Sequence, residues 1–302
     1  MVEPFAVRRV VTGWDGDGRV VVLSDGVPPL TVSAPTGHGV SELWWADARP
    51  KGPEDGGDPE PASIGAFPEG DGIAARVVRL PGVPDGTPPD QRWLPMPGGD
   101  PERPGMHRSE TLDLMVVLDG RIVLGLDAGE YELGPGDAVV QRATMHRWRV
   151  ADASPCTYLT VLIAVDGDEG LTGSGGGPGC LVTGTGADGA SGLVPAEAGA
   201  GGWAGAVVSE AASGGLGERE LWRAGDGTVF RRVAGPGPCG GRAGAAVGIA
   251  AVVSGAVRLG GADRGEVLLR SGDVAVHRGA VPGWTAAGDE PAVVVVVEIP
   301  PA

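Results

Sequence analysis

Short apolar segments rich in valine and leucine recur along the chain, and turns containing glycine or aspartate separate them. The segments LDLMVVLDG (112–120) and VGIAAVVSG (247–255) are typical, because each predicts a strand that ends in an Asp-Gly or Ser-Gly hairpin turn. Such strands recur roughly every 8–12 residues, a spacing typical of antiparallel sandwiches and barrels. With only 3 Phe, 2 Tyr and 8 Trp, the core must consist mainly of Val, Leu, Ile and Ala. We therefore predict an all-β fold without long helices, with a small barrel or sandwich in each half.

The two halves of the chain contain similar segments in the same order. Gly136 and Trp148 recur as Gly272 and Trp284 at one constant offset. The matching segments are 41–47 with 219–225, 70–82 with 225–237, 112–120 with 247–255, 134–148 with 270–284 and 154–163 with 290–299. A repeat of this extent predicts two tandem copies of one domain.

The repeat divides the chain into an N-terminal domain (1–168), a Gly/Ser-rich linker (169–178) and a C-terminal domain (179–302). The first copy also carries an extra segment, 47–69, whose proline, glycine and acidic content predicts an exposed loop.

The charge balance narrows the range of partners. The chain has 302 residues with 23 Lys and Arg against 39 Asp and Glu, which gives a formal net charge of −16. A field of this sign repels phosphate backbones and anionic membrane surfaces, so we expect neither a nucleic-acid nor a membrane partner. No segment is long and apolar enough for a signal peptide or a membrane span, and the three cysteines lack a C-x-x-C spacing. We expect a cytoplasmic protein that binds a small molecule.

Two of the four histidines lie where they could take part in chemistry. If the segment from 107 to 113 is extended, alternation places His107, Ser109, Thr111 and Asp113 on one face of the strand. His146 follows after a hairpin that has room to return beside this strand. Two imidazoles and a carboxylate form a ligand set suited to Zn, Fe, Mn or Ni. The alternative interpretation is that both histidines are hydrogen-bonded polar residues at a barrel mouth.

The spacing of these residues resembles the first motif of the cupin superfamily, in which a His-x-His pair is followed by an acidic residue and then a glycine. His107 falls on the first histidine, Asp113 on the acidic position and Gly120 on the closing glycine, whereas Ser109 stands where the second histidine would be.

The second cupin motif begins with a Gly-Asp turn and ends in a metal-binding histidine. Gly136-Asp137 and His146 occupy these places, although the loop is one residue shorter and Gln141-Arg142-Ala143 replaces the usual Pro-x-Gly. With the repeat, the resemblance extends to a bicupin, which implies two cupin-type β-barrels of the double-stranded β-helix (jelly-roll) kind.

The resemblance implies one divalent transition metal per chain, held by His107, Asp113 and His146. Iron(II) and zinc are the favoured ions, with manganese and nickel as further possibilities, because two histidines and one carboxylate match both the facial triad of iron oxygenases and a Lewis-acid site. The residues expected to support the metal or contact the substrate are Ser109, Glu110, Gln141, Arg142 and Arg147.

The second copy has lost every one of these ligands. The residues at the positions of His107, Ser109, Asp113 and His146 are Arg242, Gly244, Gly248 and Pro282. His277 falls on the position of Gln141 and is expected to be a strand-end histidine. We expect the C-terminal barrel to supply packing surface only, and the protein to be a monomer or a homodimer of bicupins.

The sequence thus predicts a metal-dependent enzyme that acts on a small oxygenated organic substrate, such as a keto or hydroxy compound of polyketide-like or aromatic type. Non-haem Fe(II) oxygenase chemistry is the leading hypothesis, and a non-redox cyclase, isomerase or lyase is the first alternative. The second alternative is a bicupin that binds a small ligand without catalysis, because a fold does not determine a function.

Overall fold

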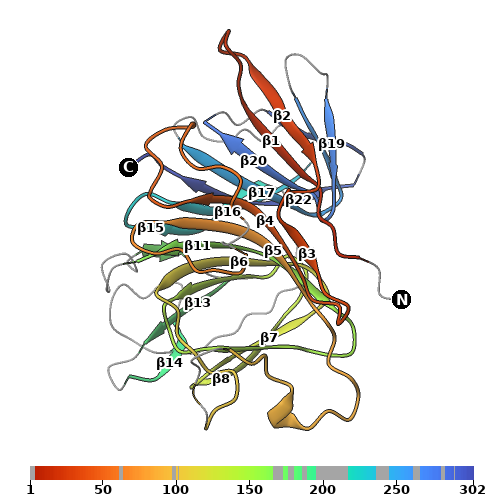
Figure 1. Cartoon of the computed structure of the whole chain (residues 1–302), viewed down its shortest axis with the longest axis vertical. Coiled ribbons are helices and arrows are strands. Elements are labelled where there is room, and N and C mark those ends of the chain that lie inside the picture. Colours follow the sequence, from red (N-terminus) through yellow and green to blue (C-terminus); the bar gives the residue numbers. More distant parts are fainter. Residues whose placement is uncertain are drawn as a thin grey trace.

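The computed structural model describes residues 4–60, 64–96, 100, 102–165, 173–175, 180–185, 189–194, 217–235, 245–260, 266–279, 283–288 and 290–302. Over these residues the chain is almost entirely β-structure (Figure 1), and the only helical element is a 3₁₀ turn, η2 (Pro89–Gln91). The all-β prediction is therefore confirmed. No helix within the described ranges is long and apolar enough to cross a membrane.

Most strands of the N-terminal half form one large curved sheet. This eight-stranded sheet has the order β14-β13-β9-β6-β11-β5-β4-β3, and a three-stranded sheet, β10-β7-β8, lies against it. The bounds are β3 (Thr31–Ser33), β4 (Gly39–Ala46), β5 (Ile73–Leu80), β6 (Thr111–Asp119), β7 (Ile122–Leu126), β8 (Gly129–Leu133), β9 (Ala138–Arg142), β10 (Arg147–Val150), β11 (Cys156–Ala164), β13 (Cys180–Thr185) and β14 (Ser191–Leu193).

The C-terminal half repeats this plan. Its eight-stranded sheet has the order β12-β15-β16-β22-β17-β20-β1-β2, and the smaller sheet is β19-β18-β21. The bounds are β1 (Arg9–Trp14), β2 (Val20–Gly26), β12 (Gly173–Gly175), β15 (Gly217–Ala224), β16 (Val229–Gly235), β17 (Val247–Ser254), β18 (Ala256–Leu259), β19 (Val267–Arg270), β20 (Val274–Arg278), β21 (Trp284–Ala286) and β22 (Ala292–Ile299).

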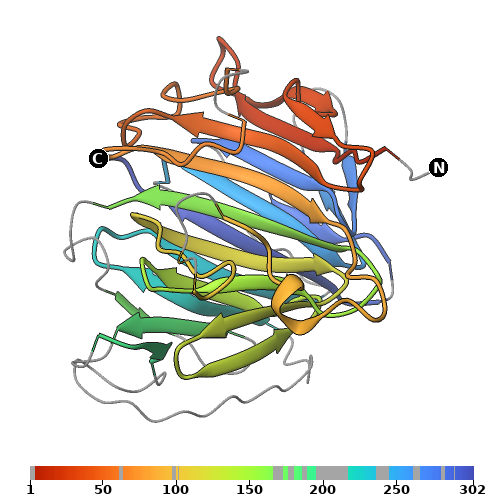
Figure 2. The same ribbon diagram turned by 60° about the horizontal axis from the view of Figure 1, so that its bottom comes forward.

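The central strands of the large sheets, such as β6, β17 and β22, are buried on both faces, which explains why they are apolar almost throughout. In β6, Leu112, Leu114 and Val116 belong to a core cluster that joins the two large sheets, which lie one behind the other (Figure 2). The alternate residues Met115 and Val117 belong to a separate cluster inside the N-terminal barrel. A third cluster fills the inside of the C-terminal barrel. The molecule is thus two β-barrels packed back to back.

The two halves exchange strands. Strand β1, from the start of the chain, pairs in parallel with β20, with Val10 opposite Ala275. Strand β13, from the C-terminal side of the repeat boundary, pairs in parallel with β9, with Cys180 opposite Ala138. The division near residue 168 therefore separates the sequence repeats, whereas each large sheet contains strands from both. Within the expected linker, residues 173–175 form β12, which pairs with β15.

The extra segment 47–69 lies against the C-terminal half. Asp58 forms an ion pair with Arg9 of β1, and the carbonyl oxygen of Pro53 accepts a hydrogen bond of 2.8 Å from Nε of Arg278. Gly279 has φ of +70° and lies so close to Pro53 that a Cβ atom there would approach it to 2.5 Å. This loop is largely exposed, and its contacts with β1 and β20 connect the first half of the chain to the C-terminal sheet.

Candidate metal centre

His107 and His146 lie directly opposite each other. Their backbones exchange two hydrogen bonds, each of 2.9 Å, and form an isolated bridge ahead of β6 and β10. Residues paired in this way point their side chains to the same face. The two imidazole rings accordingly lie with their centroids 4.3 Å apart.

Backbone carbonyl groups determine which nitrogen of each ring carries the proton. Nδ1 of His107 lies 2.9 Å from the carbonyl oxygen of Gly105, and Nδ1 of His146 lies 2.8 Å from that of Thr144. Because a carbonyl oxygen only accepts hydrogen bonds, each Nδ1 must donate, and in the neutral ring the lone pair is on Nε2. Burial lowers the pKa of both rings, and the neighbouring His107 helps to lower that of His146, to about 3. At neutral pH both rings are therefore neutral with an unprotonated Nε2, the state that binds a metal.

The loop before His146 is held by a chain of hydroxyl and amide groups. Nε2 of Gln141 donates to the carbonyl oxygen of Thr144 at 3.1 Å and also contacts the Thr144 hydroxyl. That hydroxyl donates to Oγ1 of Thr183 at 2.9 Å, and Thr183 also accepts from the backbone N–H of Arg142 at 2.9 Å. Since Thr183 lies on β13, the exchanged strand holds the loop that orients the His146 ring.

Asp113 lies on the same wall of the barrel, further along β6. It is opposite Gln141 on β9 and alternates with Met115, which belongs to the interior cluster. Its Oδ1 atom is buried and has no hydrogen-bond partner. Burial raises the pKa of Asp113 to about 7, against the opposing effects of a hydrogen bond with the Thr111 side chain and of the Arg76 guanidinium. The barrel interior thus contains a carboxylate oxygen that no protein group satisfies.

The structure does not bring Asp113 up to the two histidines. Within the described ranges, no three His, Cys, Asp or Glu residues lie close enough together to hold a metal ion. A continuous extended strand over 107–113 was the condition for the expected alternation. It does not form, because β6 begins only at Thr111. The register shifts by one residue between the His107–His146 pair and the Leu112–Arg142 pair, so the segment between them does not continue the regular pairing of β6.

The other candidate residues divide between the interior and the outside of the barrel. Ser109 and Gln141 are buried, and Oγ of Ser109 and Oε1 of Gln141 have no partner. Glu110 is exposed. The guanidinium of Arg142 lies 5.7 Å from the Trp222 ring, across the interface between the barrels. That of Arg147 lies 3.8 Å from the ring of Trp93, on the outer side of β10. Gln141 is linked to His146, because both side chains contact the carbonyl oxygen of Thr144.

Arg76 and Glu42 form an ion pair inside the N-terminal barrel, and neither was among the expected site residues. Nε of Arg76 lies 3.2 Å from Oε2 of Glu42, and these residues expose 5% and 0% of their surfaces. Arg76 is opposite Thr160 on β11, which is in turn opposite Met115, so its side chain faces the interior. The signal was present in the repeat, because the segments 70–82 and 225–237 both carry an arginine at this position of an apolar strand.

The C-terminal barrel carries no such histidine pair among its described residues. Gly248, at the position of Asp113, lies opposite His277 in the sheet. His277 is fully buried, its Nδ1 lies 2.7 Å from the hydroxyl oxygen of Thr12, and its ring packs against the edge of Trp284. The remaining positions, Arg242, Gly244 and Pro282, lie outside the described residues.

Comparison with known proteins confirms the resemblance for the segment that carries the histidines. Residues 92–162 match the family model of the cupin domain, so the N-terminal barrel contains a cupin domain. A protein C' of the phomopsin biosynthesis cluster of Diaporthe leptostromiformis is 48% identical over 73 residues, which are 21% of this chain and 37% of that protein. A cupin-domain-containing oxidoreductase, fogC, of Aspergillus ruber is 48% identical over 44 residues, 14% of this chain and 22% of that protein.

This chain thus covers well under half the length of these curated relatives. Among solved structures, the bacterial pirin YhhW of Escherichia coli, determined in complex with nickel(II), has a TM-score of 0.48 and 10% identity over 90% of this chain and 96% of that one.

Proposed function

We propose that this chain is a metal-dependent cupin enzyme whose N-terminal barrel acts on a small oxygenated organic molecule. His107 and His146 would hold one divalent transition metal through Nε2, and Asp113 would be the third ligand. The observation that carries this proposal is the hydrogen bonding of the two rings, because each Nδ1 proton is directed to a backbone carbonyl and each Nε2 lone pair remains for a metal.

The fit of the donor set to a metal is complete for the imidazoles and incomplete for the carboxylate. Asp113 has the right chemistry and an unsatisfied Oδ1, but it would have to approach the histidine pair to complete the set. A divalent ion bound there supplies a Lewis acid that polarises a keto or hydroxyl oxygen, or, if it is iron(II), a centre that activates O₂. The oxidoreductase name of the Aspergillus relative supports the oxidative branch for this chain.

The residues of the barrel itself would orient the substrate and exclude water. Met115, Val139 and Leu124 are buried around the interior and provide apolar walls. Tyr158 belongs to the same wall, and burial raises the pKa of its phenol, so the hydroxyl keeps its proton and can donate a hydrogen bond to a substrate oxygen. The positive charge of Arg76 favours the ionised form of Asp113, the form that can ligate a metal.

The metal content of purified protein tests this proposal, measured by mass spectrometry after reconstitution with iron(II) or zinc. We expect one metal ion per chain, and we expect His107→Ala and His146→Ala each to abolish stoichiometric binding. His38→Ala is the matched control, because His38 is exposed and should retain full metal content. Equal metal content in all three variants would show that the site is misplaced.

The role of Asp113 needs its own comparison. Asp113→Asn should lower metal affinity about as strongly as the loss of a histidine, whereas Glu110→Gln should leave it unchanged, because Glu110 is exposed. Loss of metal in the Glu110 variant with retention in the Asp113 variant would reassign the carboxylate. Binding of iron(II) in preference to zinc supports oxygenase chemistry, and the reverse supports a non-redox cyclase, isomerase or lyase.

A further inference from the structure

The side-chain amide of Gln141 is held in one orientation by the loop that carries His146. Its Nε2 atom donates to the carbonyl oxygen of Thr144 at 3.1 Å and also contacts the Thr144 hydroxyl. These two contacts use the two donors of the amide. Because a carbonyl oxygen only accepts hydrogen bonds, the amide nitrogen must face Thr144 and the amide oxygen must face away from it. Gln141 therefore presents a single acceptor, Oε1, in a fixed orientation.

This acceptor has no partner and faces the interior of the N-terminal barrel. Gln141 exposes 1% of its surface, and its Oε1 atom is buried without a hydrogen bond. The residue lies directly opposite Asp113 and alternates along β9 with Val139, which belongs to the interior cluster. Asp113 and His107 are only partly buried, so solvent reaches the interior beside Gln141. A buried amide oxygen of this kind is costly unless a donor reaches it.

The proposed metal site does not account for this acceptor. The atoms proposed to bind the metal are Nε2 of His107, Nε2 of His146 and a carboxylate oxygen of Asp113, whereas Oε1 of Gln141 is not among them. The amide is nevertheless linked to that site, because Nδ1 of His146 donates to the same carbonyl oxygen of Thr144 at 2.8 Å. One carbonyl group thus holds both the acceptor and a metal-binding ring, and a small molecule bound at the histidine pair lies within reach of Oε1.

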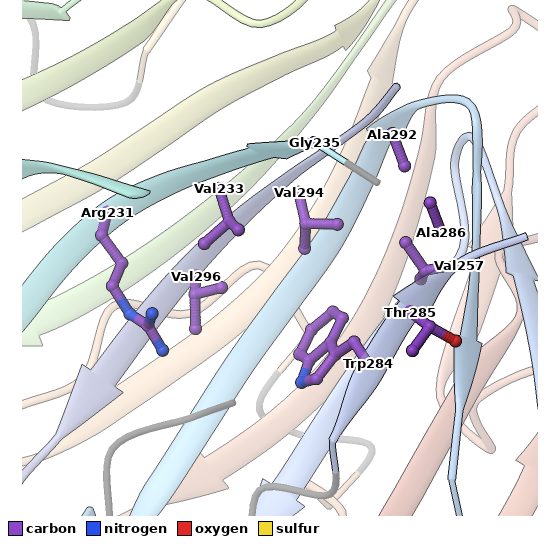
Figure 3. Close-up of a pocket in the computed structure, with 10 residues that line it drawn as sticks. All are labelled: Arg231, Val233, Gly235, Val257, Trp284, Thr285, Ala286, Ala292, Val294 and Val296. Atoms are coloured by element: carbon purple, nitrogen blue, oxygen red, sulfur yellow. The ribbon is translucent and has the colours of Figure 1, made fainter. Parts of the chain in front are cut away.

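The C-terminal barrel provides the contrast. In Figure 3 the walls of a small pocket in that barrel are mainly apolar, with the Arg231 guanidinium at one end. At the position of Gln141 the second copy has His277, whose Nδ1 lies 2.7 Å from the hydroxyl oxygen of Thr12. The amide acceptor therefore belongs to the copy that keeps the histidine pair, which connects it with that site rather than with the barrel fold common to both copies.

We propose that the substrate of the N-terminal barrel carries a hydroxyl group beside its metal-bound oxygen, as an α-hydroxy ketone does, and that this hydroxyl donates a hydrogen bond to Oε1 of Gln141. The proposal rests on the metal site proposed above for the same barrel. A ketone without the hydroxyl binds less well, because the buried amide oxygen then keeps no partner. A carboxylate oxygen in the place of the hydroxyl is disfavoured, because two acceptors would face each other. Gln141 is thus a specificity-determining residue.

Isothermal titration of the full chain loaded with zinc tests this substrate class, because zinc does not oxidise the ligands. We expect α-hydroxyacetophenone to bind about tenfold more tightly than propiophenone, in which a methyl group of similar size replaces the hydroxyl. Mass spectrometry measures the metal content of the same samples. Absence of bound zinc contradicts the proposed metal site. Zinc-loaded protein that binds the two ligands equally, or binds neither, overturns the substrate class alone and leaves water as the partner of Oε1.

The variant Gln141→Met tests the residue, because methionine keeps the length of the side chain and removes the acceptor. We expect the two ligands then to bind within about twofold of each other. Thr144→Val is the matched control, because it removes only the hydroxyl that Gln141 contacts, and it should retain the preference for α-hydroxyacetophenone. A preference that survives in Gln141→Met, or is lost equally in both variants, would overturn the role of Gln141. The comparison of the two ligands on the wild type keeps the proposal falsifiable should Gln141→Met fail to fold.

Discussion

Replacing Glu298 by leucine should strongly destabilise the C-terminal barrel, and replacing Arg231 by methionine at the same time should restore most of the loss. In the wild type, the guanidinium donates two hydrogen bonds to the carboxylate, and both side chains are at most 5% exposed. Leucine is the residue at the equivalent position, 162, of the first copy, so the apolar side chain suits this place in the fold. The single variant removes the carboxylate that Arg231 binds through Nε and Nη2, whereas the double variant removes both charges.

The expected magnitudes differ sharply between the variants. Removing one partner of a buried ion pair typically costs about 3–5 kcal/mol, whereas replacing both by apolar residues is often neutral or stabilising. A loss of this size is a large part of the roughly 5–15 kcal/mol by which domains are stable. The exposed pair Arg258–Glu266, with side chains 48% and 59% exposed, provides the control, because such pairs contribute only about 0.2–1 kcal/mol.

Urea unfolding, followed by tryptophan fluorescence and circular dichroism, measures these free energies. We expect Glu298→Leu to lower the free energy of unfolding by about 3 kcal/mol or more, and the double variant Arg231→Met/Glu298→Leu to recover to within about 1 kcal/mol of wild type. The control variant Glu266→Gln should change it by less than about 1 kcal/mol. A single variant no worse than the exposed control, or a double variant no better than the single one, would refute the reasoning.

Two further predictions concern other parts of the molecule. Thr183→Val removes the hydroxyl that the His146 loop contacts, so it should weaken metal binding about tenfold or more, whereas Thr185→Val, at the exposed end of the same strand, should not; isothermal titration with zinc measures both. Burial lowers the pKa of His277 from 6.5 to about 3, so its neutral ring contributes stability that is present above pH 6.5 and is lost as the pH falls toward 3. Relative to His277→Gln, the wild type should therefore lose about 3 kcal/mol between about pH 7 and pH 4 in urea titrations, and parallel pH profiles of the two proteins would contradict this.

The sequence predicted the strands and the two-barrel plan because both depend on local pattern. The segments 112–120 and 247–255 form β6 and β17 largely as expected, since alternation and hairpin turns are encoded by neighbouring residues. The exchange of β1 and β13 could not be predicted in this way. Which strand completes a sheet depends on the packing of edges that are remote in the sequence, and a repeat records only that the two copies are similar.

The candidate site shows the same division. The cupin motif spacing identified His107 and His146, and the structure places them side by side. The one-residue shift in register between the histidine pair and Asp113 is a feature that alternation along a single strand does not reveal. Arg76 and Glu42 were missed because charged residues in apolar strands carry no local sign of a partner on the neighbouring strand.

The strand exchange also determines when each barrel can be completed during synthesis. Thr183 of β13 contacts the carbonyl oxygen of Val140 only 43 residues earlier, so the first barrel closes soon after its last strand leaves the ribosome. Thr12 of β1 bonds to His277, 265 residues later. At a translation rate of about 5–20 residues per second, β20 is synthesised roughly 13–53 s after β1. A ribosome that stalls before Val274 therefore leaves β1 paired only with β2, and its other edge, which β20 would cover, is a template for pairing with other chains.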